Sequence, residues 1–403
     1  MRGQSEVPTV KMHSRNGFSE RDQRELLRIR RLLHRTAEPA FNEHRTGQIV
    51  EETLRGLGLE VSRAAGTGVV GLLRGGTAEG PTVAIRADMD ALPVAEQTGV
   101  EWASETPGVM HACGHDAHMA MVLGAAMVLA PMACQLRGNV KFIFQPAEEV
   151  AGGAEPMLNQ GVMDDPSVDM VFAMHVSPDY PVGSIAVAPG YATAAQDRFI
   201  LEIRGRGGHA AFPHLCVDAL AAACEFVTGL QHVVSRGLDP QEPAIVHVGT
   251  LHAGEAFNIV AGSARLSASV RTLSDAARTR VEQLIRGRVE ALCAVTGITA
   301  DLEYLHSCPS VINTPEAVEV ACSAAERALG KGSVKRPVGP SMVGEDFAYF
   351  ARHAPGALIW IGARPEQGEV YPLHHPRFLV PDATILAGVA VWRQIALSLC
   401  GSS

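Results

Sequence analysis

The sequence predicts an α/β fold: a mixed, largely parallel sheet flanked by helices, with a smaller α+β domain inserted into it. Two observations predict it. Short apolar strands alternate with amphipathic helices in both outer parts of the chain, while residues 199–304 follow the strand–helix–strand–strand–helix–strand order of ferredoxin-like domains. We therefore expect an N-terminal arm at 1–18, a large discontinuous domain at 19–192 and 306–403, and an inserted domain at 193–305.

Composition excludes several classes of protein. The chain has 403 residues, of which 47% are hydrophobic and 19% charged, as in an ordinary globular protein. A net charge of −9 without a Lys/Arg block argues against a nucleic-acid partner. No uninterrupted apolar run reaches 18 residues and no apolar leader core opens the chain, so we expect no membrane span and a cytoplasmic location. Eight scattered cysteines fit a reducing compartment.

Local patterns predict the elements of the first part. Ser19 can cap a first helix whose leucines begin at Leu26, and a second helix runs from Glu43 to Leu57 with Gly58 as its stop. Further along we expect strands at 69–73, 83–86, 139–145 and 169–174, and an apolar helix at 119–130 ending before Pro131.

The remaining elements follow the same rules. In the inserted domain we expect strands at 199–204, 244–251, 264–272 and 298–304, and helices at 217–235 and 275–295. The large domain then resumes with a helix at 315–329, a strand at 357–362 and a last helix from about Asp382.

One eight-residue stretch, His111 to His118, concentrates metal-binding side chains. It contains three histidines, Cys113 and Asp116, and their nitrogen, thiolate and carboxylate groups are donors that zinc-like divalent metals prefer. Gly114 lets the backbone bend so that Cys113 and His115 can face one ion. A histidine-rich surface loop is the alternative interpretation of this stretch alone.

Three strand ends also carry chemical groups. Asp88 and Asp90 follow the second predicted strand, Glu148 and Glu149 follow the strand at 139–145, and His175 ends the strand at 169–174. Turn-forming aspartates or a solvated glutamate pair would explain each group separately. Because parallel strands bring their carboxyl ends to one sheet edge, the repetition indicates a shared site.

At this point the motifs RADMDALP, HACGHDAHMAMVLGAA, FQPAEE, GRGGHAAFPH, VGEDFAYF and LHHPRF, in this order, resemble the amidohydrolase branch of metallopeptidase family twenty, which includes hippurate hydrolase. The resemblance extends from about Leu26 to Leu397. It implies a metal-dependent hydrolase that cleaves the amide bond of N-acyl amino acids, an aminoacylase or deacetylase. It also implies a homodimer formed through the inserted domain, which acts as a lid.

The resemblance further implies two divalent metal ions and roles for individual residues. The ligands would be Cys113, His115, Glu149, His175 and His374. Glu148 would be the general base, and the Asp90 side chain would orient a ligand imidazole. Asp88 replaces a metal-binding histidine of the wider family, and we leave it outside the ligand set. Cys113 favours zinc, although manganese, cobalt and nickel also suit such donors.

In the lid, the resemblance assigns substrate contacts to three residues. His209 would stabilise the oxyanion, often from a partner subunit, while Asn258 and Arg271 would hold the substrate carboxylate. The turn Asn258-Ile259-Val260-Ala261-Gly262 lacks the proline that relatives carry, which would loosen the carboxylate pocket. Glu345 in VGEDFAYF would be structural.

Other functions are also compatible with parts of this pattern. A metallo-carboxypeptidase or dipeptidase would use the same metals on short peptides. A non-catalytic small-molecule-binding relative would have lost the base or a ligand, and neither is missing. A cysteine hydrolase using Cys113 with His115 would leave the carboxylates unexplained.

Overall fold

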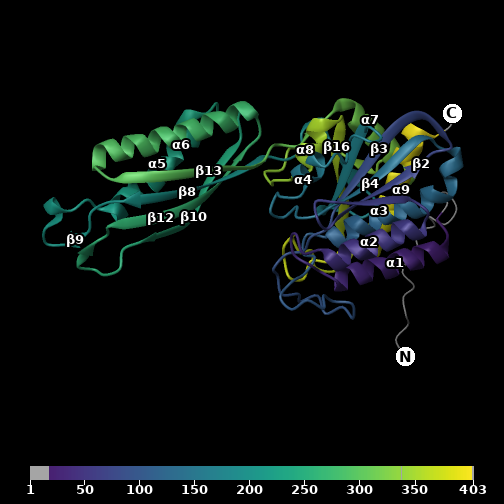
Figure 1. The fold of residues 1–403 in the computed structure, drawn as a ribbon, viewed down its shortest axis with the longest axis horizontal. Helices are drawn as coiled ribbons and strands as arrows, with labels where there is room; N and C mark the ends of the chain where they lie inside the picture. Colours follow the sequence, from purple (N-terminus) through teal and green to yellow (C-terminus); the bar gives the residue numbers. More distant parts are fainter. Residues whose placement is uncertain (1–17, 337, 402–403) are drawn as a thin grey trace. The chain divides into compact units, whose positions relative to one another are not determined.

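The computed structural model describes residues 18–336 and 338–401, so the predicted N-terminal arm lies outside it except for Phe18. The described residues form two compact units (Figure 1). Unit 1 takes its residues from Met1–Pro189, Asn313–Val338 and His353–Ser403. Unit 2 comprises Gly190–Ile312 and Gly339–Arg352.

Unit 1 contains an eight-stranded mixed sheet in the order β1-β2-β4-β3-β5-β16-β6-β15. Neighbours are parallel from β4 through β3 and β5 to β16, whereas β1, β2 and β4 pair antiparallel. This confirms the expected mixed, largely parallel sheet. The strands are β1 (Glu60–Ala64), β2 (Gly68–Arg74), β3 (Thr77–Asp88), β4 (Arg137–Gln145), β5 (Met170–Pro181), β6 (Ile185–Ala186), β15 (Val334–Lys335) and β16 (Gly356–Arg364).

Helices pack on this sheet and on one another through apolar side chains. Ser19 caps the first helix as expected, since its Oγ accepts a hydrogen bond from Asp22 N at 3.2 Å. The core joins Leu26 and Trp392 to Phe142 of β4. The helices of unit 1 are α1 (Glu20–Arg35), α2 (His44–Gly56), α3 (His115–Leu129), α4 (Ala154–Asn159), α7 (Pro315–Leu329) and α9 (Asp382–Cys400), with a 3₁₀ turn at Ala130–Gln135.

One strand differs from expectation in a way that matters for the site. We expected a strand that ends at Met174, directly before His175, but β5 continues to Pro181. The reason is that β16 keeps pairing beyond this point, with Trp360 opposite His175 and Gly362 opposite Ser177. His175 therefore projects from within a strand, which holds its backbone rigidly.

Unit 2 has an antiparallel four-stranded sheet in the order β10-β12-β8-β13, with two helices packed on it. Its core joins Phe199 of the sheet to Phe226 and Ile285 of the helices. The elements are β7 (Gly190–Tyr191), β8 (Ala195–Arg204), β9 (Gly208–His209), α5 (Ala219–Gly237), β10 (Ala244–Ala253), β11 (Ile259–Val260), β12 (Ser263–Thr272), α6 (Asp275–Thr296), β13 (Thr299–Cys308) and β14 (Ile312–Asn313), with a 3₁₀ turn at Pro213–Leu215.

A segment that we placed in the large domain belongs to unit 2 instead. Gly339–Arg352, which includes most of helix α8 (Phe347–His353), is bound to unit 2 by several polar contacts. Ala194 N donates to Val343 O at 3.0 Å, and the Tyr349 hydroxyl donates to Ser307 O at 2.8 Å. These partners are distant in sequence, so no local pattern indicated the assignment.

Two helices have the length and hydropathy of membrane spans: His115–Gln135, which joins α3 to the 3₁₀ turn, and α9. Their most apolar windows are 67% and 61% buried inside the protein. A helix that is apolar on all sides and buried in this way is a core helix.

Gly124 of α3 lies where helices approach closely, and Gly287 of α6 does not. A Cβ at Gly124 would press on Leu26 and Val389, whereas one at Gly287 would meet no atom within 4 Å. We expect Gly124→Ala to lower the free energy of unfolding by about 1–2 kcal/mol through overpacking. The control Gly287→Ala should raise it by about 0.5–1 kcal/mol through helix propensity. Denaturant unfolding followed by circular dichroism measures both, and stabilisation by Gly124→Ala would contradict the packing.

Candidate metal centre

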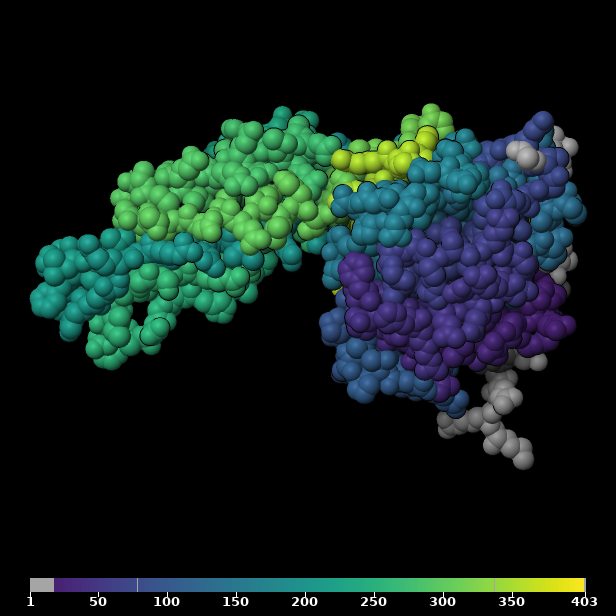
Figure 2. All heavy atoms as spheres, in the orientation of Figure 1, coloured from purple at the N-terminus to yellow at the C-terminus, as the bar shows by residue number. Residues whose placement is uncertain are grey.

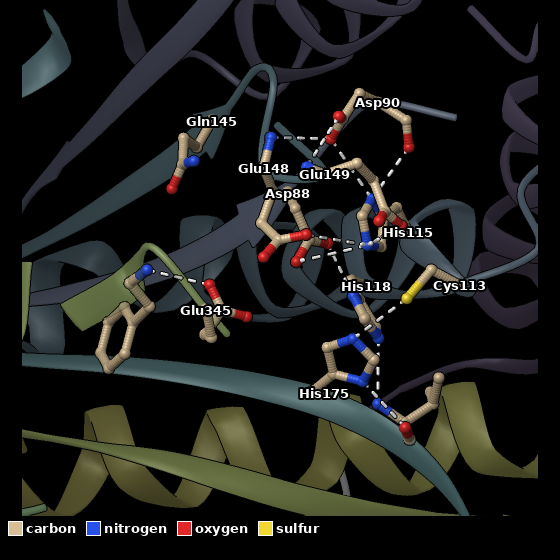
Figure 3. Close-up of polar contacts among 12 residues, drawn as sticks. Asp88, Asp90, Cys113, His115, His118, Gln145, Glu148, Glu149, His175 and Glu345 are labelled. Carbon is tan, nitrogen blue, oxygen red and sulfur yellow. Dashed lines mark hydrogen bonds and ion pairs between the residues drawn. The ribbon is translucent and has the colours of Figure 1, made fainter. Parts of the chain in front are cut away.

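The loops after β3 and β4 leave the same edge of the unit 1 sheet. Asp88, the last residue of β3, pairs with Gln145, the last residue of β4. Asp90 follows the first strand, and Glu148 and Glu149 follow the second, so parallel pairing brings both carboxylate loops together. Figure 3 shows these side chains converging with those at the start of α3.

Gly114 forms the turn that places the cluster. Its φ is 85°, in the left-handed region, and it ends the loop that leads into α3. An added Cβ would lie 2.7 Å from Val176 Cγ2, so space as well as backbone conformation requires glycine. Cys113 therefore ends the loop while His115 begins the helix, and both are buried.

His115 has one ring nitrogen fixed and the other open. Its Nδ1 donates to the backbone carbonyl of Asp90 at 2.8 Å. Among the described residues, its buried Nε2 has no hydrogen-bond partner, although Glu149 Oε1 lies at 3.8 Å and Glu148 Oε2 at 3.9 Å. A histidine held in this way has its tautomer set for metal binding through Nε2.

His175 is prepared in the same manner. Its Nδ1 donates to Val176 O at 2.8 Å, and its ring lies against Trp360 with centroids 5.4 Å apart. Nε2 then faces Cys113 Sγ at 3.4 Å. The thiol and the imidazole can therefore contact one ion.

Asp90 holds the backbone of the glutamate pair, a contact that the sequence did not indicate. Its carboxylate oxygens accept from the backbone N–H groups of Glu148 and Glu149, each at 3.0 Å. His115 Nδ1 lies 2.8 Å from the Asp90 backbone carbonyl and 3.5 Å from the Asp90 carboxylate, so the expected role of Asp90 in orienting this imidazole stays a prediction. The two glutamates lie in a turn that begins after Ala147, whose φ is 55°.

His374 approaches from the other side of Glu149. Its Nε2 lies 3.6 Å from Glu149 Oε1, and its backbone N–H donates to Ala112 O at 2.8 Å. The His374 side chain is 55% exposed, unlike the other candidate ligands. The neighbouring His375 has its Nδ1 occupied by the backbone N–H of Arg377 at 3.1 Å.

The five expected ligands fall into two overlapping groups of donor atoms, each within 4.8 Å. One group is Cys113, His115 and His175; the other is Cys113, Glu149 and His374. Glu149 Oε1, like His115 Nε2, has no hydrogen-bond partner within the described part of the chain. Buried polar atoms without partners are rare, so this donor set fits two divalent ions, and Cys113 is common to both groups.

The electrostatics of the site favour a cation. Burial, reinforced by the charges of Glu149 and Glu148, raises the pKa of the Cys113 thiol well above its usual range. Burial alone would lower the pKa of His115, but the negative charge of Asp88 and other carboxylates raises it to about 10. A divalent ion would offset this excess of negative charge and stabilise the thiolate.

Asp88 and His118 support the site from outside the two donor groups. Asp88 Oδ1 accepts from His118 Nδ1 at 2.6 Å, and its Oδ2 accepts from Arg86 at 2.9 Å. His118 Nε2 then accepts from Val176 N at 3.0 Å. These bonds connect β3, α3 and β5, so His118 has both nitrogens engaged in holding the scaffold.

Comparison with known proteins identifies the family. The family model for peptidase family M20/M25/M40 matches residues 84–398. The chain belongs to this family. N-acetylcysteine deacetylase of Bacillus subtilis (strain 168) is 37% identical to it over 374 residues, covering 92% of this chain and 96% of the relative. Thermostable carboxypeptidase 1 of Saccharolobus solfataricus is 36% identical over 378 residues, covering 92% and 94%.

A solved structure agrees with the fold and supports two divalent metal ions. The YXEP protein of Bacillus subtilis, a dinuclear metal binding peptidase from the M20 family, superposes with a TM-score of 0.80 at 34% identity, covering 94% of this chain and 98% of that chain. The expected family is therefore confirmed. This M20 member is a metal-dependent hydrolase of amide bonds with candidate ligands for two divalent ions.

The three lid residues do not lie together within unit 2. His209 pairs with Ile259, and Ala210 N donates to Asn258 O at 3.0 Å, so His209 and Asn258 share one end of the unit, where β9 lies in Figure 1. Figure 2 shows two projections at this end, in the colours of residues near 210 and near 255. Arg271 lies near the opposite end of β12, eight residues or about 26 Å from Ser263.

A buried ionic network beside the site was not predicted from the sequence. Asp116, next to His115, lies 3.0 Å from Arg30 Nε and accepts from His34 Nδ1 at 2.8 Å. His34 Nε2 in turn contacts Glu96 Oε1 at 3.3 Å, and Arg30 lies over the Trp102 ring at 4.1 Å. The only indication of this network in the sequence is the position of Arg30 and His34 on the apolar side of α1.

The adjacent His374 and His375 provide a direct test of the donor groups. We expect His374→Ala to reduce bound metal from about two ions per chain to about one, because one group loses its exposed imidazole. His375→Ala should leave the metal content unchanged. Elemental analysis of both proteins after gel filtration measures this. A normal content in His374→Ala would remove His374 from the ligand set.

Proposed function

We propose that this M20 enzyme hydrolyses N-acyl amino acids, with Glu148 as the general base beside two divalent ions. The ions would be held by Cys113, His115, Glu149, His175 and His374, and zinc is the metal that the shared thiolate favours. The observation that carries the proposal is the convergence of these donors around the unpartnered atoms His115 Nε2 and Glu149 Oε1.

The chemistry divides between the ions and the protein. When bound, two divalent ions would lower the pKa of a water molecule and polarise the amide carbonyl. Glu148 would accept a proton from the attacking water and deliver it to the leaving amine nitrogen. Asp90 supports this role because its carboxylate fixes the Glu148 backbone at 3.0 Å. Burial of the surrounding residues would exclude bulk water and strengthen these interactions.

The lid residues would contact the substrate as the family resemblance implies. His209 would donate to the developing oxyanion, while Asn258 and Arg271 would hold the substrate carboxylate. Asn258 and Arg271 lie too far apart in one chain to hold the same carboxylate. This separation supports a homodimer in which His209 and Asn258 of the partner subunit contact the substrate.

Two further features support details of the proposal. All eight cysteines, which lie within the described residues, are free, as expected for a cytoplasmic protein. Similarity to N-acetylcysteine deacetylase supports an N-acyl amino acid substrate. Similarity to the carboxypeptidase of Saccharolobus solfataricus favours a second candidate function, the cleavage of short peptides at the carboxyl end.

The substrate class can be tested by amine release. A panel of N-acetyl, N-benzoyl and long-chain N-acyl amino acids, together with dipeptides, would be offered to chelator-stripped protein with and without added zinc or manganese. We expect metal-restored release from the acyl amino acids. Faster release from dipeptides would favour the peptidase, and no release with bound metal would contradict both.

Variants of Glu148 and Glu149 distinguish the proposed base from the proposed metal ligand. We expect Glu148→Gln to keep its metal but to lose turnover by about 100- to 10,000-fold, the usual contribution of a general base. Glu149→Gln, one residue away, should lower the bound metal. Steady-state rates and metal content of both variants measure this, and near-normal turnover in Glu148→Gln would exclude it as the base.

A further inference from the structure

Glu43 carries a carboxyl group yet is completely buried, with 0% of its surface exposed. It precedes α2, where a carboxylate usually stays in solvent and caps the helix, but here its side chain makes no capping hydrogen bond. Burial of a carboxyl group is unfavourable unless its oxygens are hydrogen-bonded. Its partners therefore indicate what the side chain does.

Both Glu43 oxygens have specific partners. Oε2 accepts from the hydroxyl of Thr67 at 2.6 Å, and Thr67 is itself buried. Oε1 accepts from the backbone N–H of Ala147 at 2.9 Å, across 104 positions of sequence. Glu43 thus reaches from α2 to the turn that carries the catalytic glutamates, with Thr67 fixing the orientation of its carboxyl group.

The turn at Ala147 needs such support. Ala147 has a φ of 55°, in the left-handed region that is unfavourable for a residue with a Cβ. Its carbonyl accepts from Gly152 N at 3.0 Å. With Glu43 on its N–H and Asp90 on the next two amides, three successive N–H groups bond to buried carboxylates. The backbone before Glu148 and Glu149 is therefore fixed by two acceptors from different segments.

The segment that carries Glu43 also holds the Asp90 loop. Ala91 N donates to Glu38 O at 2.8 Å, and Pro39 forms an isolated bridge with Ala91. One short segment before α2 thus connects the two loops that meet at the site. Displacement of the Glu43 carboxyl group would loosen the glutamate turn without removing any group assigned to chemistry.

We propose that Glu43 is a positioning residue that fixes the Ala147 backbone and thereby presents Glu148 and Glu149 to the metal centre. The proposal rests on the roles given above to these glutamates. It assigns Glu43 no contact with substrate or metal. The effect requires an acceptor for the Ala147 N–H and a partner for Thr67 Oγ1, and a glutamine provides both at the same size.

The test compares Glu43→Leu, which removes both hydrogen bonds, with Glu43→Gln, which can keep them. Glu38→Leu is the matched control, because the Glu38 carboxylate accepts from Arg45 N and Thr46 N at the start of α2 and not from the turn. The measurements are amide hydrogen exchange of residues 147–149 in metal-free protein, bound metal per chain, kcat and KM.

For Glu43→Leu we expect exchange at 147–149 to rise, bound metal to fall, and kcat to fall by at least about tenfold, or about 1.4 kcal/mol. KM should change less than kcat. Glu43→Gln should resemble the wild type in all four measurements. Glu38→Leu should lower the melting temperature while leaving exchange at 147–149 unchanged.

The proposal would be overturned if Glu43→Leu left both kcat and the amide exchange of residues 147–149 unchanged. It would also be overturned if Glu43→Leu and Glu38→Leu raised the exchange of residues 147–149 equally. If Glu43→Leu does not fold, Thr67→Val removes only the hydroxyl partner and should still raise exchange at Ala147; unchanged exchange there would also overturn it. Exchange without metal or substrate reports on Glu43 even if Glu148→Gln shows that Glu148 is not the base.

Discussion

The buried carboxylate of Asp90 is the interaction on which the rest of the site depends. The two carboxylate oxygens accept hydrogen bonds from the backbone N–H groups of Glu148 and Glu149, while the backbone carbonyl of Asp90 accepts from His115 Nδ1. One residue therefore positions the proposed base and one candidate ligand, and it sets the tautomer of another candidate ligand. This is possible because β3 and β4 are parallel neighbours that end together at Asp88 and Gln145.

The metal centre combines two kinds of donor in different surroundings. Cys113, His115 and His175 are almost fully buried and come from the loop before α3, the start of α3 and β5. His374 lies on an exposed loop. A protein that buries most of its donors in the core while leaving one at the surface can hold ions firmly and still admit a substrate.

The order of strands and helices was predictable from the sequence, because the alternation of apolar and polar residues is a local signal. The motif order brought the candidate donors to attention, and their roles as ligands stay a prediction. The sequence did not predict contacts that depend on tertiary structure. We predicted Glu43 only as the start of a helix, and no local pattern indicated its hydrogen bond to the backbone of Ala147, 104 positions away. We predicted that Asp90 orients an imidazole, and no local pattern indicated that its carboxylate would also accept from the amides of Glu148 and Glu149. Likewise, Gly339–Arg352 joins unit 2 through bonds to residues that are distant in sequence.

We propose a dinuclear site in which Cys113 belongs to both groups of donor atoms. X-ray absorption spectroscopy of the zinc-loaded protein tests it most directly, because sulfur and nitrogen or oxygen neighbours are distinguishable. For the dinuclear site we expect a zinc–sulfur distance of about 2.3 Å together with a zinc–zinc distance of about 3.5–4 Å, and both should be lost in Cys113→Ala. A spectrum with only nitrogen and oxygen neighbours and no second zinc would contradict it.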